Sequence, residues 1–336
     1  MNSHPNYQAL VKVMAGPPLY NKANLAIAST KRVCFFALHR FSRHGLYGQG
    51  AWTSDFLGTD YMGKAHGPRM RIDLAGYHQF AMPDLFSDPL WQPSFKLSLI
   101  KAAYYDGPPP RKQCCDIATY KQNFQKIMEA WRESEFCQYL RSYIEKGSAG
   151  TVPVTAIFCF DLGGLGMVNE PGYHESRGLL RHVAAMEIRD TLQRIYQGTE
   201  IPIFAQDHKY CTCCVETLRS YDIEVLSSPA AFLRVDGNSF IISRSPETPV
   251  RQITADLTDT WNGPAGMLCD KIIDNGLCDL PLEKLRDASS PRLFQYKILN
   301  ARHTRTLDDS EATLVVEGAV YPAAVFGEVG LYRRGS

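Results

Sequence analysis

A dense run of polar side chains, residues 206–210 (Gln-Asp-His-Lys-Tyr), directly follows the short apolar segment 201–205. The carboxylate of Asp207 could act as a general base or bind an ammonium or guanidinium group, and His208 or Tyr210 could relay a proton. Asp207 could instead cap the helix expected next, by accepting hydrogen bonds from its first backbone N–H groups. We favour the functional interpretation of this cluster.

A second candidate is the glycine-rich stretch Asp161-Leu-Gly163-Gly164-Leu-Gly166, which follows the apolar run 152–160. It is superficially similar to a loop that binds dinucleotide phosphates. Its spacing is not Gly-x-Gly-x-x-Gly, and the helix expected next begins several residues too late for a turn that cradles phosphate. We therefore favour a plain tight turn, with nucleotide binding as the alternative.

The cysteines near the polar cluster are a third candidate. His208, Cys211, Cys213 and Cys214 are ligand types that suit zinc. They lack the paired Cys-x-x-Cys knuckles of structural zinc sites, and adjacent cysteines on a helix point in different directions. We expect no metal here and interpret these cysteines as buried thiols. Glu216, further along the same helix, points either toward the polar cluster or toward solvent.

One expected helix is rich in basic residues. Arg177, Arg181, His182 and Arg189 lie within it, and Arg177 and Arg181 are one turn apart. Such an edge could meet RNA phosphates, but an ordinary solvated face is the interpretation we favour. The sequence has no Gly-x-Ser-x-Gly elbow, Walker loop or His-Glu-x-x-His string, so no motif indicates one of the commonest classes of hydrolase or kinase.

The elements that must position these residues alternate between strand and helix. The continuous apolar run 152–160 is typical of a strand buried on both faces of a parallel sheet. Further strands are expected at 201–205, 223–226, 239–243 and 265–269, and helices at 179–195, 211–221 and 250–257. This order predicts an α/β protein with a Rossmann-like, doubly wound, mostly parallel sheet. Ligands of such sheets bind outside the carboxyl ends of the strands, where the strand order reverses.

The chain divides into three parts. Residues 1–115 form a loop-rich N-terminal extension, broken by glycines and prolines, with a short strand expected at 32–38. Residues 116–300 form the Rossmann-like domain, which begins with two amphipathic helices, the second capped by Ser134 and ended by the stretch from Gly147 to Gly150. Residues 301–336 form a tail that packs on this domain and adds short strands at an edge of its sheet.

Composition excludes several classes of protein. The 36 Lys and Arg residues balance 35 Asp and Glu residues, so no global basic field would drive nonspecific nucleic-acid binding. No apolar stretch is long enough to span a bilayer, and the N-terminus lacks the apolar core of a signal peptide. We expect a cytoplasmic protein without a membrane partner, whose ten cysteines are reduced.

Several dispersed motifs resemble one known family. The stretches are 157–166 (IFCFDLGGLG), 181–185 (RHVAA), 204–207 (FAQD) with Tyr210, 232–236 (FLRVD), 240–243 (FIIS), 249–253 (PVRQI) and 263–265 (GPA). In this order they resemble the sensitivity-to-red-light-reduced (SRR-like) domain over roughly residues 130–275. The later stretches, with the long N-terminal extension, look like the fungal branch of that family.

This resemblance implies an activity. The fungal branch includes arginine-containing cyclodipeptide synthases, which condense arginine from arginyl-tRNA with a second amino acid to a diketopiperazine and need no cofactor. Asp207, Glu216 and Tyr210 would then be catalytic, with Asp207 and Asp161 as carboxylates, Glu216 as the base and Tyr210 as a supporting hydroxyl. Residues assigned to substrate binding are Asp161, Gly163, Gly164, His182, Gln206 and His208.

The chain departs from the synthases at one point. Their Asp-Asp-x-x-Glu motif does not occur here, and the region after Tyr210 instead contains Cys-Thr-Cys-Cys-Val-Glu216. Glu216 could retain the final acid, the second substrate could differ, or the chain could be no synthase. The alternatives are a noncatalytic regulatory or scaffold protein of the same family and a nucleotide-dependent oxidoreductase that uses the loop 161–166.

Overall fold

The computed structural model describes a central body and a few separate segments of the chain. The described residues are 22, 69–74, 95–100, 117–165, 176–207, 209–273, 287, 289–316, 319–322 and 324–336. The strand expected at 32–38 lies outside them. None of the helices in these ranges is both long and apolar enough to cross a membrane.

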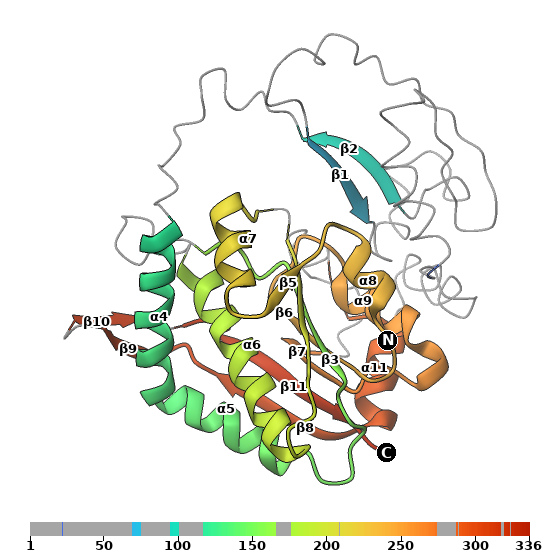
Figure 1. Ribbon diagram of the computed structural model, residues 1–336. Helices are drawn as coiled ribbons and strands as arrows, with labels where there is room; N and C mark the ends of the chain where they lie inside the picture. Colours follow the sequence, from blue (N-terminus) through green and yellow to red (C-terminus); the bar gives the residue numbers. More distant parts are fainter. Residues whose placement is uncertain are drawn as a thin grey trace.

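The core of the fold is a seven-stranded sheet (Figure 1) with the order β5-β4-β3-β6-β7-β11-β8. The strands are β3 (Ala156–Phe160), β4 (Ile203–Gln206), β5 (Ile223–Val225), β6 (Ser239–Ser243), β7 (Gly266–Asp270), β8 (Ala301–Asp308) and β11 (Glu328–Arg334). The first five are parallel to one another, and β11 is antiparallel to both of its neighbours. The expected fold class, a Rossmann-like, doubly wound, mostly parallel sheet, is confirmed.

The order of the strands reverses between β3 and β6. From β3 the chain moves outward to β4 and β5, then returns to place β6 on the other side of β3. β3 pairs with β4 through Phe160 and Gln206, and with β6 through Phe160 and Ser243. The residues that follow these three strands therefore leave the sheet side by side. This reversal is where ligands of doubly wound sheets bind.

Helices cover both faces of the sheet (Figure 1). One group consists of α4 (Ile117–Glu133), α5 (Glu135–Lys146), α6 (Ser176–Ile195) and α7 (Thr212–Arg219); the other consists of α8 (Ala230–Arg234), α9 (Val250–Leu257) and α11 (Pro291–Gln295). The turn Asp259–Trp261 follows α9, and Tyr296–Asn300 leads from α11 into β8. The helical pair α4 and α5 packs against α6.

The central strand β3 is buried on both faces because its side chains alternate between two cores. Ile157 and Cys159 belong to the core beneath α4–α7. On the opposite face Phe158 stacks on Phe204, with ring centroids 5.1 Å apart, and Phe160 stacks on Phe232 at 4.2 Å. A continuous apolar run is what this burial requires.

Helix α5 begins and ends as predicted. The Ser134 hydroxyl accepts a hydrogen bond from the Cys137 backbone N–H at 3.2 Å, which makes Ser134 the N-cap. Gly147 is the C-cap. The buried side of the helix consists of Phe136, Cys137, Leu140 and Ile144.

The tail contributes more than the edge strands expected of it. β8 is an edge strand, but β11 lies inside the sheet between β7 and β8. Its residues Val329–Arg333 are buried, so it completes the core instead of lying against it. The two remaining pairs of strands are separate antiparallel ribbons: β9 (Thr313–Val316) with β10 (Ala319–Pro322), and β1 (Arg69–Leu74) with β2 (Phe95–Ile100).

Candidate functional site

Two aspartates leave neighbouring strands at the reversal of strand order. Asp161 directly follows β3, and Asp207 directly follows β4. The Asp161 N–H donates to the Gln206 carbonyl at 3.1 Å, which extends the pairing of the two strands by one residue. The structure thus brings together the two carboxylates that the sequence predicted to lie at this edge.

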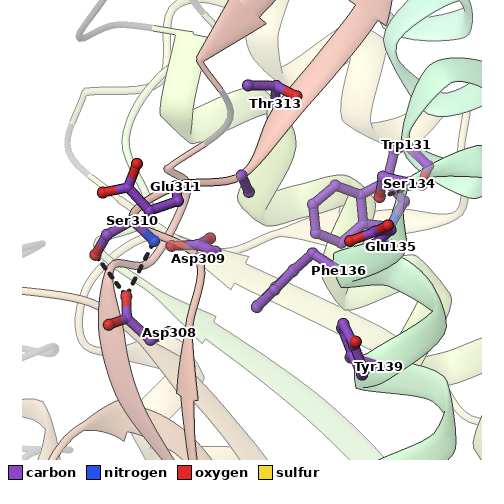
Figure 2. Close-up of a pocket in the computed structure, with 11 residues that line it drawn as sticks. Trp131, Ser134, Glu135, Phe136, Tyr139, Asp308, Asp309, Ser310, Glu311 and Thr313 are labelled. Carbon is purple, nitrogen blue, oxygen red and sulfur yellow. Dashed lines mark hydrogen bonds between the residues drawn. The ribbon is translucent and has the colours of Figure 1, made fainter.

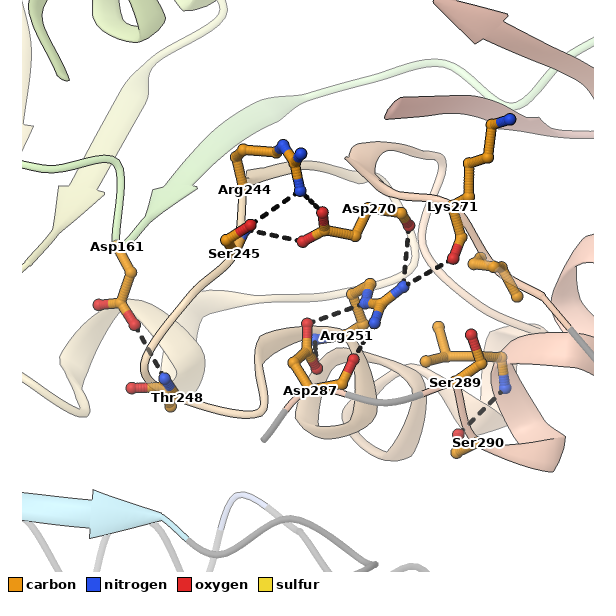
Figure 3. Close-up of polar contacts among 12 residues, drawn as sticks. Asp161, Arg244, Ser245, Thr248, Arg251, Asp270, Lys271, Asp287, Ser289 and Ser290 are labelled. Atoms are coloured by element: carbon orange, nitrogen blue, oxygen red, sulfur yellow. Dashed lines mark hydrogen bonds and ion pairs between the residues drawn. The ribbon is translucent and has the colours of Figure 1, made fainter. Parts of the chain in front are cut away.

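Asp161 has an unusual backbone conformation. Its φ of 51° is in the left-handed region, which aspartate tolerates better than most residues other than glycine. The carboxylate accepts a hydrogen bond from the Thr248 N–H at 3.0 Å (Figure 3). Thr248 belongs to the loop after β6, so this bond joins the loops on the two sides of the reversal.

Burial raises the pKa of Asp161 to about 6. The negative charges of Asp207 and Glu247 contribute to this rise, and the hydrogen bonds from Thr248 oppose it. Three carboxylates are therefore close enough to influence one another. We call Asp161, Asp207 and Glu247 the carboxylate group.

The carboxylate of Asp207 organises two turns. One of its oxygens accepts the Gly163 N–H at 2.7 Å, and the other accepts the Lys209 N–H at 2.8 Å. The alternative capping role is wrong, because the N-cap of α7 is Cys211, whose sulfur accepts the Cys214 N–H. Asp207 instead holds the loop after β3 against the loop after β4.

The glycine-rich loop packs tightly on α6. A Cβ atom at Gly178 would lie 2.2 Å from the Gly164 carbonyl oxygen, so only glycine fits there. Gly163 has a φ of +92°, which favours glycine. The Gly163 N–H binds Asp207, and the Leu165 N–H donates to the Cys214 sulfur at 3.4 Å. Two donors that a phosphate would need are thus bound to protein side chains, which favours the tight-turn interpretation.

Three arginines lie close to one another beside the loops that follow β3 and β6. Arg181 donates to the carbonyls of Leu162 at 3.2 Å and Val325 at 2.9 Å. Arg244, which follows β6, donates to the Phe326 carbonyl and the Ser245 hydroxyl and forms an ion pair with Asp270 (Figure 3). Burial, followed by the charges of Arg244 and Arg177, lowers the pKa of Arg181 to about 10. We call Arg177, Arg181 and Arg244 the arginine group.

Asp309 in the tail supports this arrangement. Its buried carboxylate accepts the backbone N–H groups of Val325, Phe326 and Gly327. The carbonyls of Val325 and Phe326 then face Arg181 and Arg244. The tail therefore helps to position the arginine group, which nothing in the sequence pattern indicated.

The predicted solvated face on α6 is wrong for Arg181 and His182, because both contact the interior. His182 is fully buried, with Nδ1 2.5 Å from the Gly178 carbonyl and Nε2 2.7 Å from the Tyr210 hydroxyl. A carbonyl only accepts, so Nδ1 carries the proton and the Tyr210 O–H donates to Nε2. Burial lowers the pKa of His182 to about 4, so the ring is neutral at pH 7. The hydrogen bond between Tyr210 and His182 therefore connects α6 to the loop after β4.

The remaining predicted residues occupy different places. The Gln206 side chain is buried and accepts the Ala231 N–H at 3.0 Å, so it connects β4 to α8. Glu216 is half-buried on α7, and its carboxylate makes no hydrogen bond or ion pair with Asp161 or Asp207. His208 lies outside the described residues.

Two buried polar atoms near the reversal find no hydrogen-bond partner in the described part of the chain: the Ser243 hydroxyl, at the end of β6, and Nε of Arg177. Six other buried polar atoms among the described residues also lack such a partner, so these two atoms do not by themselves mark a ligand site. No cluster of three or more His, Cys, Asp or Glu residues that could hold a metal is found among the residues that the structure describes.

A pocket of about 380 Å³ lies elsewhere, between the start of α5 and the turn from β8 to β9 (Figure 2). Its walls are Trp131, Ser134, Glu135, Phe136, Tyr139 and residues 308–313. None of these residues directly follows β3, β4 or β6, the strands at the reversal of strand order, where ligands of doubly wound sheets bind. We therefore place the candidate site at the strand ends, where the carboxylate and arginine groups meet.

Comparison with known proteins identifies no family for this chain. No family model matches it, and no curated protein matches it. Human N-acetylserotonin methyltransferase in complex with SAM is 12% identical, with a TM-score of 0.29, over 66% of this chain and 57% of that one. A loganic acid methyltransferase with SAH is 9% identical, with a TM-score of 0.28, over 56% and 76% of the two chains. At these TM-scores neither likeness carries an argument, and the fold assignment rests on the strand order described above.

Proposed function

We propose that this protein is an aminoacyl-transferring enzyme of the SRR-like family, similar to the arginine-containing cyclodipeptide synthases. The observation that carries the proposal is the carboxylate group at the reversal of strand order. Ionised Asp161 is disfavoured by burial and by two like charges. A bound cation would relieve this repulsion, and a guanidinium or α-ammonium group is such a cation.

The arginine group supports a substrate that also carries negative charge. The charge of Asp207 acts on Arg181, so the acidic and basic groups are neighbours. Arginyl-tRNA has a cationic aminoacyl end attached to an RNA end with phosphates. The carboxylate group suits the first and the arginine group suits the second.

The reaction assigns separate roles to the two aspartates. Asp207 holds the cationic group of the substrate, and Asp161, whose pKa of about 6 suits proton transfer near neutral pH, accepts the proton of the attacking α-ammonium. The amine nitrogen then attacks the ester carbonyl carbon of a second aminoacyl group, the C–O bond breaks, and the released ribose hydroxyl takes a proton. Repetition of this step at the remaining ester closes the diketopiperazine. Because each new amide bond displaces one ester, both amino acids must arrive as esters.

Tyr210 and His182 have a positioning role in this scheme. The Tyr210 hydroxyl is buried and donates to His182, so it holds the loop that carries Asp207 and does not meet substrate. No hydrogen bond or ion pair joins Glu216 to either aspartate in the described part of the chain, and we assign the base to Asp161 in its place.

The test is heterologous expression followed by mass spectrometry of cell extracts for new arginine-containing cyclic dipeptides. We expect a product from the native chain and at least a tenfold loss in Asp161→Asn and Asp207→Asn. Asp222→Asn is the matched control, because Asp222 is exposed and also has a positive φ, of 59°. Glu216→Gln should retain activity.

Two outcomes would contradict this proposal. Soluble native protein that yields no cyclic dipeptide would favour a noncatalytic role in the same family. A product whose amount is unchanged by Asp161→Asn but abolished by Glu216→Gln would keep the activity and refute the assignment of the base.

A further inference from the structure

A Cys-x-x-Cys pair begins helix α7. Cys211 is the N-cap of the helix and Cys214 lies in its first turn. The Cys211 sulfur accepts the Cys214 N–H at 3.4 Å, and its thiol donates to the Cys214 sulfur, with the two sulfurs 3.3 Å apart. A disulfide bond is about 2.05 Å long. A short movement of two side chains would therefore suffice to form it.

The two thiols differ in accessibility. Cys211 is half-buried at the helix start, whereas Cys214 is 3% exposed. Cys-x-x-Cys motifs and helix N-termini both favour the thiolate form of an attacking cysteine. The Cys211 hydrogen bond and burial raise the pKa of the Cys214 thiol. This asymmetry suits Cys211 as the attacking thiol and Cys214 as the resolving thiol.

Cys214 also contacts the candidate site. Its sulfur accepts the Leu165 N–H at 3.4 Å, four residues after Asp161. The same loop is held by Asp207 through Gly163. A change at the Cys214 sulfur would therefore reach the loop that carries Asp161.

We propose that Cys211 and Cys214 form a reversible redox site that controls the loop 161–165. The Cys211 thiolate attacks one sulfur of a low-molecular-weight disulfide such as oxidised glutathione, and its S–S bond breaks to release one thiol. Cys214 then attacks the mixed disulfide, the Cys211–Cys214 bond forms, and a second thiol leaves. Two protein thiols are oxidised and one external disulfide is reduced. The movement of the Cys214 sulfur toward Cys211 weakens its bond with the Leu165 N–H.

The chemical test treats the full-length protein with oxidised glutathione, then alkylates the remaining thiols and maps the tryptic peptide 210–219. Cys213→Ser is the key variant, because it leaves only Cys211 and Cys214 in this peptide. We expect the peptide to lose two hydrogens and resist alkylation, and to recover both thiols after reduction. Cys214→Ser should instead trap a glutathione adduct on Cys211.

Alkylation of both cysteines after oxidation of the Cys213→Ser variant would overturn the proposal, as would a native disulfide that needs Cys213. The structural test is hydrogen exchange of the Leu165 amide in the same variant, which should be at least several-fold faster in the oxidised form than in the reduced form. An equal rate in the two forms would refute control of the loop. Neither readout depends on the proposed enzymatic activity.

Discussion

Two aspartates in this protein have a pKa raised to about 6 by burial, and their surroundings differ (Figure 3). Asp287 receives the guanidinium of Arg251 at 2.8 Å and its backbone N–H at 3.0 Å. Arg251 also donates to the carbonyls of Asp270 and Lys271, so its guanidinium is fully engaged. Among the residues that the structure describes, Thr248 donates to the Asp161 carboxylate, and the negative charges of Asp207 and Glu247 help to raise the pKa of Asp161.

The difference separates an acid with its own cationic partner from an acid surrounded by like charges. The charge of Arg251 lowers the pKa of Asp287 against the effect of burial, whereas like charges add to the effect of burial on Asp161. A buried pair that satisfies itself has no use for a ligand cation, and removal of either member leaves a buried charge. A buried carboxylate among like charges is stabilised when a ligand cation binds. Replacement of that carboxylate by a neutral side chain relieves the repulsion.

Asp287→Ala should therefore have the largest effect on stability. The substitution leaves the Arg251 guanidinium, 5% exposed, without its carboxylate. We expect the free energy of unfolding to fall by about 3–5 kcal/mol, measured by urea denaturation. The double variant Arg251→Met with Asp287→Leu should recover most of this loss, since it leaves no buried charge. A single variant as stable as the native protein would remove the contrast between the two aspartates.

Asp161→Asn should change the free energy of unfolding less than Asp287→Ala does, and the change should depend on pH. The pKa of Asp161 is raised in the folded state, so its contribution to stability is fully present below pH 4 and is lost as the pH rises through about 6. Relative to Asp161→Asn, the native protein should be about 1–2 kcal/mol less stable at pH 7 than at pH 4.5. Urea denaturation at the two pH values measures this difference, with the exposed Asp222→Asn as control. The opposite sign would mean that Asp161 has a cationic partner after all.

The parallel part of the sheet could be predicted almost residue by residue. The strand at 239–243 and the helix at 250–257 have the predicted bounds, because each is an uninterrupted apolar or amphipathic run between turn residues. The position of β11 could not be predicted in this way. Its apolar pattern marks a buried strand, but its place between β7 and β8 depends on pairing with β7, about 60 residues earlier in the sequence, as well as with the nearer β8.

The candidate site could be predicted only where it depends on local sequence patterns. Asp161 and Asp207 follow strands that periodicity reveals, and the rule for doubly wound sheets places them together. Arg244 follows the predicted strand 239–243 directly, so the same rule could have found it. Asp309 acts through backbone N–H groups of residues 325–327, and no local pattern reveals such a partner. The sequence suggests Tyr210 as a proton relay because no local pattern reveals that its hydroxyl is bound by His182, 28 residues earlier.

Lys209→Met should have the smallest effect on stability of the three substitutions. It also tests whether the carboxylate group binds a cation. Lys209 pairs with Glu247 at 3.0 Å, and 53% and 30% of their side chains are exposed, so the pair contributes at most about 1 kcal/mol to stability. Loss of the lysine leaves the charge of Glu247 less compensated beside Asp161, which makes the carboxylate group a stronger cation site. Arginine methyl ester should bind about two- to fivefold more tightly to this variant and more weakly to Glu247→Gln, measured by calorimetry at low salt. Lys121→Met on α4 controls for net charge, because Lys121 is exposed. If the two site variants shifted the affinity in the same direction, the carboxylate group would not be where the cation binds.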